Sequence, residues 1–204
     1  VANQTAGTTA QIQALANTAV TFSAVSIGTQ TWSASNMSIV PSLGTYWTAY
    51  SGSGGSATDN DGYFYTWDAA QTVCPVGWKL PSDAEWKTLE GYLGMMTDAQ
   101  QDATGYRGST EGTTLKFDRS IGFNAKLTGF YNANSYYDRG TTASYWSSTS
   151  RFGSGNHGYV RTLSTSETGV GRYAHTKNLG YSVRCLKVEI REVLDPIISI
   201  KGSM

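Results

Sequence analysis

Two histidines and four carboxylates are the side chains in this sequence that first suggest acid–base chemistry. His157 and His175 both lie in polar segments rich in Gly, Ser and Asn. The acidic residues that could act as a glycosidase-type pair are Asp68, Asp83, Glu85 and Asp138. The sequence contains no Gly-x-Ser-x-Gly elbow, no His-Glu-x-x-His zinc helix and no phosphate loop. We therefore expect a protein that is not an enzyme and has no catalytic residues, with a hydrolase of unknown type as an alternative.

A second group of residues, late in the chain, is better suited to binding than to catalysis. Tyr and Arg dominate binding hot spots, while Ser, Asn and Gly provide adaptable hydrogen bonding, as in an antibody paratope. Tyr159 and Arg161 are two residues apart in a predicted strand, so their side chains are expected on one face. The alternative is that these side chains only pack against their neighbours. The predicted ligand-binding residues are Arg151, Phe152, Asn156, His157, Tyr159, Arg161, Arg172, Tyr173, His175, Thr176 and Asn178.

The segment Asp59-Asn-Asp-Gly62 has oxygen ligands of the kind that calcium prefers. An EF-hand loop requires further ligands and a distal Glu, which are absent here. Asn/Asp-Gly is also the ordinary sequence of a tight turn. We therefore favour a turn, with calcium as the alternative, and expect no cofactor and no metal site.

The charge balance argues against several classes of partner. The 204 residues contain 15 Lys and Arg against 15 Asp and Glu, so the formal net charge is zero. A neutral chain gives no electrostatic reason to expect nucleic acid or an anionic membrane as the partner. The sequence has no initiator Met, no leader and no apolar run of the ~20 residues needed for a transmembrane helix. We expect no membrane insertion, and we expect any signal peptide to be removed or to lie outside this sequence.

The strongest structural signal is the start of a helix at Ser82. Ser82 and Glu85 have the spacing of a capping box, and Trp86, Leu89 and Leu93 recur at helical spacing. Glycine at 94 marks the end of the helix. Just before it stands Cys74, and the other cysteine is Cys185 in a strand-like segment. We predict a disulfide between Cys74 and Cys185, which indicates an oxidising compartment, with two buried free thiols as the alternative.

The remaining elements follow from local patterns. We predict a hairpin over 25–32 and a second helix within 97–104, capped by Thr97. The expected strands are 63–67, 145–148, 158–163 and 180–185, and the expected loops are 105–112, 149–157 and 169–178. Residues 188–200 alternate weakly and suggest an edge strand or a docked tail. Arg184 is expected to form a structural ion pair. The tryptophans expected in the core are Trp32, Trp67, Trp78, Trp86 and Trp146.

Several of these segments, taken in order, resemble one protein family. The motifs are Val25-Ser-Ile-Gly-Thr-Gln-Thr-Trp32, Tyr63-Phe-Tyr-Thr-Trp-Asp-Ala-Ala70, Cys74-Pro-Val-Gly-Trp78, Leu80-Pro-Ser-Asp-Ala-Glu-Trp86, Gly122-Phe-Asn-Ala125, Tyr145-Trp-Ser-Ser148 and Val183-Arg-Cys185. Together they resemble the Fibrobacter succinogenes major paralogous domain, a family with a C-type-lectin-like fold. The resemblance implies an α+β domain over 25–187 with a twisted, mostly antiparallel sheet, one or two helices and long loops. Residues 1–24 would then be an arm or stalk remnant, and 188–204 an extension.

The same resemblance suggests a function. Some relatives of this family resemble variable proteins diversified by retroelements, in which a lectin-like scaffold displays altered binding residues near its C-terminal end. It implies a secreted, cell-surface or virion-surface protein that binds a protein or glycan ligand on another cell or virus. The alternatives are a carbohydrate-binding domain and a structural cell-surface component. The absence of a Glu-Pro-Asn or Gln-Pro-Asp motif argues against calcium-dependent sugar binding.

Overall fold

The computed structural model describes residues 23–48, 61–117 and 120–189. Its strands are β1 (Ala24–Ile27), β2 (Gln30–Ser33), β3 (Tyr46–Thr48), β4 (Tyr63–Tyr65), β5 (Trp78–Lys79), β6 (Gly105–Arg107), β7 (Phe130–Asn132), β8 (Ser135–Tyr137), β9 (Thr142–Ser150), β10 (His157–Ser164), β11 (Val170–Thr176) and β12 (Leu186–Lys187). Its helices are α2 (Trp67–Ala70), α3 (Asp83–Tyr92), α4 (Asp98–Asp102) and α5 (Glu111–Phe117). The fold is therefore mixed α+β.

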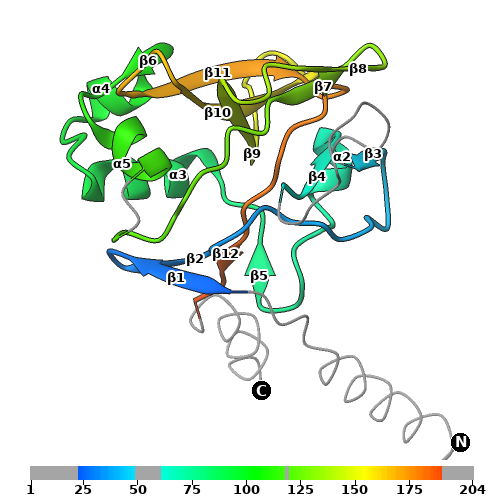
Figure 1. Cartoon of the computed structure of the whole chain (residues 1–204), viewed down its shortest axis with the longest axis horizontal. Helices are drawn as coiled ribbons and strands as arrows, with labels where there is room; N and C mark the ends of the chain where they lie inside the picture. The colour runs from blue at the N-terminus through cyan, green and yellow to red at the C-terminus, as the bar shows by residue number, and fades with distance from the viewer. Residues whose placement is uncertain (1–22, 49–60, 118–119, 190–204) are drawn as a thin grey trace, which may run out of the picture.

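Two four-stranded antiparallel sheets in the described chain lie at opposite ends of the molecule. The lower sheet has the strand order β1-β2-β12-β5, and the upper sheet has the order β6-β11-β10-β9. Helices α3, α4 and α5 lie beside and below the upper sheet (Figure 1). The hairpins β3-β4 and β7-β8, with α2, lie on the other side of the molecule. Both ends of the described chain thus belong to the lower sheet.

The hairpin that opens the fold forms as its sequence predicts. β1 and β2 pair in antiparallel register, with Ile27 opposite Gln30. Gly28 occupies the turn with a φ of 60°, a conformation that costs glycine little. A Cβ at this position would also lie 2.7 Å from the ring of Tyr92 at the end of α3. The turn is thus packed closely against α3.

Helix α3 begins at the predicted capping box. The Glu85 amide donates to the Ser82 hydroxyl at 3.2 Å, and the Ser82 amide donates to the Glu85 carboxylate at 2.8 Å. The predicted cap at Thr97 is also confirmed, because the Gln100 amide donates to its hydroxyl at the start of α4. These helix starts were predictable because their signals are local.

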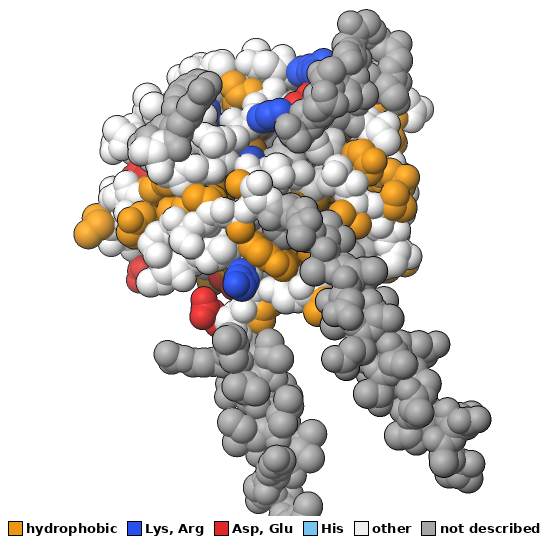
Figure 2. Space-filling model, turned by 60° about the horizontal axis from the view of Figure 1, so that its bottom comes forward, with side chains coloured by type: hydrophobic (Ala, Val, Ile, Leu, Met, Phe, Trp, Pro, Cys, Tyr) orange, Lys and Arg blue, Asp and Glu red, His pale blue; other side chains and the backbone are white. Residues whose placement is uncertain are grey.

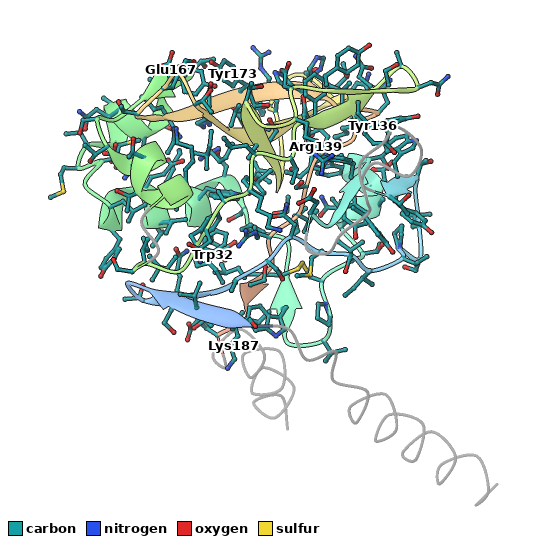
Figure 3. All side chains as sticks on the ribbon, viewed as in Figure 1. Trp32, Tyr136, Arg139, Glu167, Tyr173 and Lys187 are labelled. Carbon is teal, nitrogen blue, oxygen red and sulfur yellow. A yellow bond between two sulfur atoms is a disulfide. The ribbon has the colours of Figure 1, made fainter. Side chains whose placement is uncertain are left out.

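The core between the sheets is rich in aromatic side chains. Trp32 and Trp86 lie 4.8 Å apart between ring centroids, and Phe123 and Tyr145 pack around them. The predicted burial of Trp32, Trp86 and Trp146 is confirmed, while Trp67 and Trp78 are only half-buried. Figure 3 shows Trp32 directed into the interior above β1 and β2.

The predicted disulfide is present and joins two distant parts of the chain. Cys74 is bonded to Cys185 across 111 positions, with their Cα atoms 5.7 Å apart. The Cys185 carbonyl also accepts a hydrogen bond from the Ser33 amide, which ties the same segment to the end of β2. The cross-link therefore fixes the loop before α3 to the segment between the sheets.

Arg184 was predicted to form an ion pair, and this prediction is wrong. Its guanidinium is buried and donates to the Asn36 side chain, at 2.8 Å, and to the carbonyls of Ser33 and Phe123. It also lies 4.7 Å from the centroid of the Phe123 ring. Neutral oxygens and an aromatic face thus replace the expected carboxylate.

Three segments differ in secondary structure from the sequence prediction. Residues 169–178, expected as a loop, contain strand β11, which lies second in the upper sheet. Residues 105–112 contain β6 and the start of α5 instead of a loop. Residues 180–185 form isolated bridges to Tyr65, Tyr131 and Tyr145 but not a regular strand. Glycines at 169 and 171 suggested a loop, yet here they permit close packing against Arg107 and Tyr173.

Some predictions fall outside the part of the chain that the structure describes. These are most of the N-terminal arm, Asp59 and Asn60 of the calcium alternative, and most of the segment 188–200. Among the described residues, no helix has the length and apolar character to cross a membrane. On the face turned forward in Figure 2, the described charged side chains are few and lie in small separate groups.

Candidate functional site

The predicted ligand-binding residues fall into three separate places. One is the loop between β9 and β10 with the adjoining end of β11, which we call the tip. It contains Arg151, Phe152, Asn156, His157, Thr176 and Asn178. His157 and Thr176 are paired across β10 and β11, so these two segments of the sequence do come together. Among the large apolar side chains of the described residues, Phe152 is the most exposed, at 100%.

The tip is held in shape by its own hydrogen bonds. The Arg151 amide donates to the His157 carbonyl at 2.9 Å, and the Ser154 amide donates to the Arg151 carbonyl at 3.2 Å. The Ser154 hydroxyl and His157 Nδ1 are 2.5 Å apart. The loop is therefore closed at its base and at its centre.

Trp67 of α2 supports the tip from below. A Cβ at Gly158 would lie 2.5 Å from the Trp67 ring, so only glycine allows this approach. The Trp67 indole donates to the Ser147 carbonyl at 2.9 Å, and the Lys177 ammonium lies 3.8 Å from the ring centroid. The Lys177 amide in turn donates to the Asn156 carbonyl. Through these contacts, Trp67 connects β9 and the segment after β11 to helix α2.

The second place is a groove on the outer face of the upper sheet, which we call the outer groove. Its volume is about 250 Å³. It is lined by Tyr106, Phe130, Asp138, Thr142, Ser144, Thr162, Tyr173, His175 and Tyr181. Tyr173 and His175 were predicted as binding residues, whereas the others were not. Figure 3 shows Tyr173 at the upper surface of the molecule, directed away from the core.

Aromatic rings meet over a glycine at one side of this groove. A Cβ at Gly171 would lie 2.7 Å from the Tyr173 ring and 3.2 Å from the Tyr106 ring. The two rings are edge to face, with centroids 5.9 Å apart. Tyr173 is in turn stacked on His175 at 5.8 Å. The missing side chain at Gly171 therefore leaves room for a wall made of aromatic rings.

His175 is hydrogen-bonded and has an altered pKa. Its Nδ1 lies 2.5 Å from the Tyr181 hydroxyl. Burial lowers the pKa of His175, and the nearby His157 lowers it further. Burial also raises the pKa of Tyr181 well above its usual value. Both side chains are therefore uncharged at neutral pH, which leaves Asp138 as the charged member of the groove lining.

The third place is the interior, and here the prediction is corrected. Arg161 is 0% exposed and Arg172 is 7% exposed, so neither can contact a ligand at the surface. Arg172 forms a bidentate pair with Asp83 at 3.0 and 2.8 Å, and Arg161 contacts the same carboxylate at 2.7 Å. Tyr159 shares this face, as predicted, but it is half-buried with the Arg172 guanidinium 4.1 Å from its ring centroid.

Two further residues complete what we call the inner network. Glu90 accepts from Arg161 at 2.5 Å and from Arg107 at 2.7 Å. Burial alone would raise the pKa of Asp83, but Arg172 and Arg161 more than reverse this effect and hold it well below the usual range. Asp83 is thus held as an anion between guanidiniums and is unsuited to proton transfer.

The sequence held a signal for the inner network that the prediction did not use. Asp83, Trp86 and Glu90 follow at intervals of three and four residues, so both acids share the buried face of α3. Acidic residues on such a face require buried cations, because unpaired buried charges are costly. Arg161 and Arg172, which come later in the sequence, could supply these buried cations.

Of the other candidate catalytic groups, Asp138 shares the lining of the outer groove with His175. Glu85 caps α3 and forms a salt bridge with Lys79 at 2.8 Å, while Asp68 and Asp138 are exposed on different elements. Asp61, the described carboxylate of the calcium alternative, lies 3.0 Å from Arg139 and 3.5 Å from Lys126. Within the described ranges, His, Cys, Asp and Glu side chains form no group of three that could hold a metal ion.

Comparison with known proteins gives one positive result. Residues 25–187 match the family model of the Fibrobacter succinogenes major domain. No curated protein and no solved structure matches the chain. The match spans most of the sequence, including every element that builds the tip, the outer groove and the inner network.

Proposed function

The chain belongs to the Fibrobacter succinogenes major domain family, and we propose that it is a non-enzymatic ligand-binding protein that uses the tip to contact its partner. The scaffold in this proposal is C-type-lectin-like. The partner is a protein or glycan on another cell or virus, and the protein acts outside the cell, at a cell surface or on a virion. The disulfide supports such a location, because disulfides persist in oxidising compartments.

The observation that carries the proposal is the full exposure of Phe152 on a loop that is held in place. A fully exposed aromatic side chain offers apolar area that a partner can remove from water. Hydrogen bonds within the loop and the support of Trp67 hold the backbone that carries Phe152. A fixed loop loses less conformational entropy on binding, which favours affinity.

The neighbours of Phe152 supply polar contacts of the kind found at recognition surfaces. Arg151, Asn156 and Asn178 are exposed, and His157 is half-buried beside them. Arg provides a rigid, multidentate donor, and Asn provides both a donor and an acceptor. Substitution of such exposed residues would alter the ligand without touching the core.

This surface leads to the finer part of the proposal, a variable protein of a diversity-generating retroelement. Changes directed at adenines in Asn codons yield Asn, Tyr, Ser, Asp, His, Gly and Arg. All of these types except Asp occur between 150 and 178. Comparing sibling genes from the same source tests this idea. Differences should concentrate at exposed tip positions and spare Arg161 and Arg172, which the core requires. Siblings that vary at those two arginines and keep an invariant tip would contradict it.

The binding proposal is tested by removing the tip contacts together. A variant with Arg151→Ala, Phe152→Ala and Asn156→Ala should keep its fold, because these side chains are exposed. We expect at least a tenfold loss of affinity for a cell-surface partner captured by the wild-type domain, as expected when hot-spot residues are truncated. The measurement is a pull-down from a membrane fraction, followed by biolayer interferometry with the captured partner.

The matched control is Val76→Ala, which also removes an exposed apolar side chain. Val76 is 91% exposed and lies in the loop before β5, far in the fold from the tip. It should bind as the wild type does. Retention of the partner by the triple variant, or equal loss in both variants, would refute the proposal. Arg172 is left intact because its removal would unpair Asp83 in the interior.

A further inference from the structure

We propose that the outer groove is a second binding site, which holds one neutral saccharide ring without a metal ion. Its lining shares no residue with the tip, and the proposal is independent of the partner proposed for the tip. The argument rests on the size of the groove, its aromatic wall, its hydroxyl floor and its charge.

The size of the groove limits its occupant to one small ring. Its volume of about 250 Å³ is slightly below the ~300–1,000 Å³ typical of sites for drug-sized ligands. A peptide helix or an extended oligosaccharide would not fit within it. A single terminal sugar of a glycan is of the appropriate scale.

The aromatic wall suits the C–H face of a sugar ring. Tyr173 and His175 are nearly parallel, with an interplanar angle of 20° and centroids 5.8 Å apart, so two rings of similar orientation border the groove. An aromatic face carries partial negative charge, which attracts the weakly positive C–H groups of a pyranose. Phe130 borders the groove from β7, the strand that lies next to β9, while Tyr106 borders it from β6 beyond β11. Rings therefore stand at both edges of the sheet.

The floor supplies hydrogen bonds for the hydroxyl groups of the same ring. Ser144 and Thr162 lie side by side on β9 and β10, with their oxygens 3.2 Å apart. Each hydroxyl can donate one hydrogen bond and accept two, so their mutual contact leaves capacity for a ligand. An apolar ligand would leave this capacity unused in a partly dehydrated site, which is unfavourable.

The lining disfavours anionic ligands. Asp138 is its acidic residue, and the side chain of Asp138 is exposed. It would repel a phosphate, a sulfate or an acidic sugar. The lining contains no lysine or arginine to attract an anion. A neutral ligand with many hydroxyl groups is the class that best fits these features.

The binding experiment uses the methyl α- and β-glycosides of glucose, galactose, mannose and N-acetylglucosamine as probes. Saturation-transfer NMR with the wild-type protein, with and without EDTA, detects binding and tests the role of metals. Amide chemical shifts then locate the site in the unmodified protein. We expect at least one glycoside to bind in the presence of EDTA and to shift the amides of Tyr106, Gly171 and Tyr173.

Two variants alter the groove in different ways. Thr162→Val removes one floor hydroxyl while keeping the shape of the side chain, and we expect a loss of about three- to tenfold in affinity. Gly171→Ala adds a methyl group where the Tyr173 ring now lies, and it should weaken binding at least as much. The control is Gly155→Ala, because a Cβ at Gly155 meets no atom within 4 Å. Circular dichroism checks that each variant is folded.

Each result decides for or against the groove. Binding that Gly155→Ala and Phe152→Ala leave unchanged and Thr162→Val weakens would support the proposal. The proposal is overturned if no glycoside binds, if EDTA abolishes binding, or if the shifted amides lie elsewhere. It is also overturned if both groove variants bind as the wild type does. Because Phe152→Ala affects only the tip, failure of the groove and failure of the tip can be distinguished.

Discussion

The two faces of the upper sheet differ completely, although they are made by adjacent residues of the same strands. On the inner face, Arg161 and Arg172 are buried and paired with carboxylates of α3. On the outer face, their neighbours Thr162 and Tyr173 line a groove. Side chains alternate along a strand, so one step in sequence changes a core residue into a surface residue. The lesson is that strand position, more than residue type, decides which arginines and tyrosines can contact a ligand.

The inner network explains why the two faces are not interchangeable. Buried ion pairs add little net stability, because desolvation opposes their attraction. A shift of one residue in β10 or β11, however, would turn Arg161 or Arg172 outward and deprive Asp83 of one of its two buried partners. Such a shift carries a large penalty, so the network fixes strand register. The outer face is then presented in one arrangement.

The largest expected effect comes from substituting neighbours on opposite faces of β10. Arg161→Met leaves Glu90 and Asp83 short of a buried partner, and we expect the free energy of unfolding to fall by about 3–5 kcal/mol. Thr162→Val, one residue away, should cost less than about 1 kcal/mol, because it removes one hydroxyl contact and keeps a good strand former. Urea denaturation of both variants measures the difference. Equal losses would show that the two faces contribute alike.

Reducing the disulfide should have the next largest effect. The Cys74–Cys185 bond closes a loop of 111 positions, so its loss should lower the free energy of unfolding by about 2–4 kcal/mol. The measurement is denaturation with and without a reductant, with a Cys74→Ser, Cys185→Ser double variant as the control that should not respond to reductant. The outer groove shares no residue with this cross-link, so glycoside binding by the folded, reduced protein should persist. If binding were lost while the reduced protein stayed folded, the shape of the groove would depend on the disulfide even though no groove residue forms it.

Acid should lower the stability of the protein through Asp83 of the inner network. The guanidiniums of Arg172 and Arg161 hold the pKa of Asp83 well below its value in the unfolded chain, despite the opposing effect of burial. Near and below the unfolded value of about 3.9, the unfolded chain binds more protons than the folded one, so stability falls as pH falls. The contribution of Asp83 is complete above about pH 5. Denaturation between pH 7 and pH 3 should show this decline.

The control for the acid experiment compares two aspartates. Asp83→Asn should flatten the decline in stability between pH 5 and pH 3. Asp68→Asn, which alters an exposed aspartate of α2, should leave it as steep as in the wild type. If the stability of both variants declines between pH 5 and pH 3 as steeply as that of the wild type, carboxylates other than Asp83 and Asp68 are responsible.

The smallest expected effect tests how α3 presents its acids to the sheet. Ser82→Ala removes the cap beside Asp83 and should cost about 1 kcal/mol. Thr97→Ala removes the equivalent cap of α4, which has no buried residues in its span, so the loss should be smaller. Thermal denaturation of the two variants compares them. A larger loss of stability for Thr97→Ala than for Ser82→Ala would show that the contacts of α3 with the inner network do not increase the contribution of its cap.

The sequence predicted the features that depend on neighbouring residues. The caps at Ser82 and Thr97 and the hairpin turn at Gly28 are confirmed. The distant pairing of Cys74 with Cys185 is also confirmed, and it could be predicted because the sequence has two cysteines. The alternation of Tyr159 and Arg161 on one face is also present. Alternation could not specify which face of the strand points inward. That choice depends on α3, an earlier segment of the chain that supplies the acidic partners.

The largest errors have the same origin. Residues 169–178 contain glycines and polar residues and therefore suggested a loop, whereas Arg107 and Thr162 accommodate those glycines within a sheet. Arg172 was consequently expected at the surface. The outer groove was missed because its lining comes from seven strands or segments that only the fold brings together. Local patterns carry no information on such tertiary contacts.

The position of β1 and β12 in the lower sheet has a practical consequence for handling the protein. Residues 24 and 187 both lie at the end of the molecule opposite β11 (Figure 1). An affinity tag, a bead or a fluorescent fusion attached beyond either strand would therefore be anchored on the side away from Tyr173. Immobilised in this way, every copy on a sensor chip would face the sample with its upper sheet, whichever end carries the attachment.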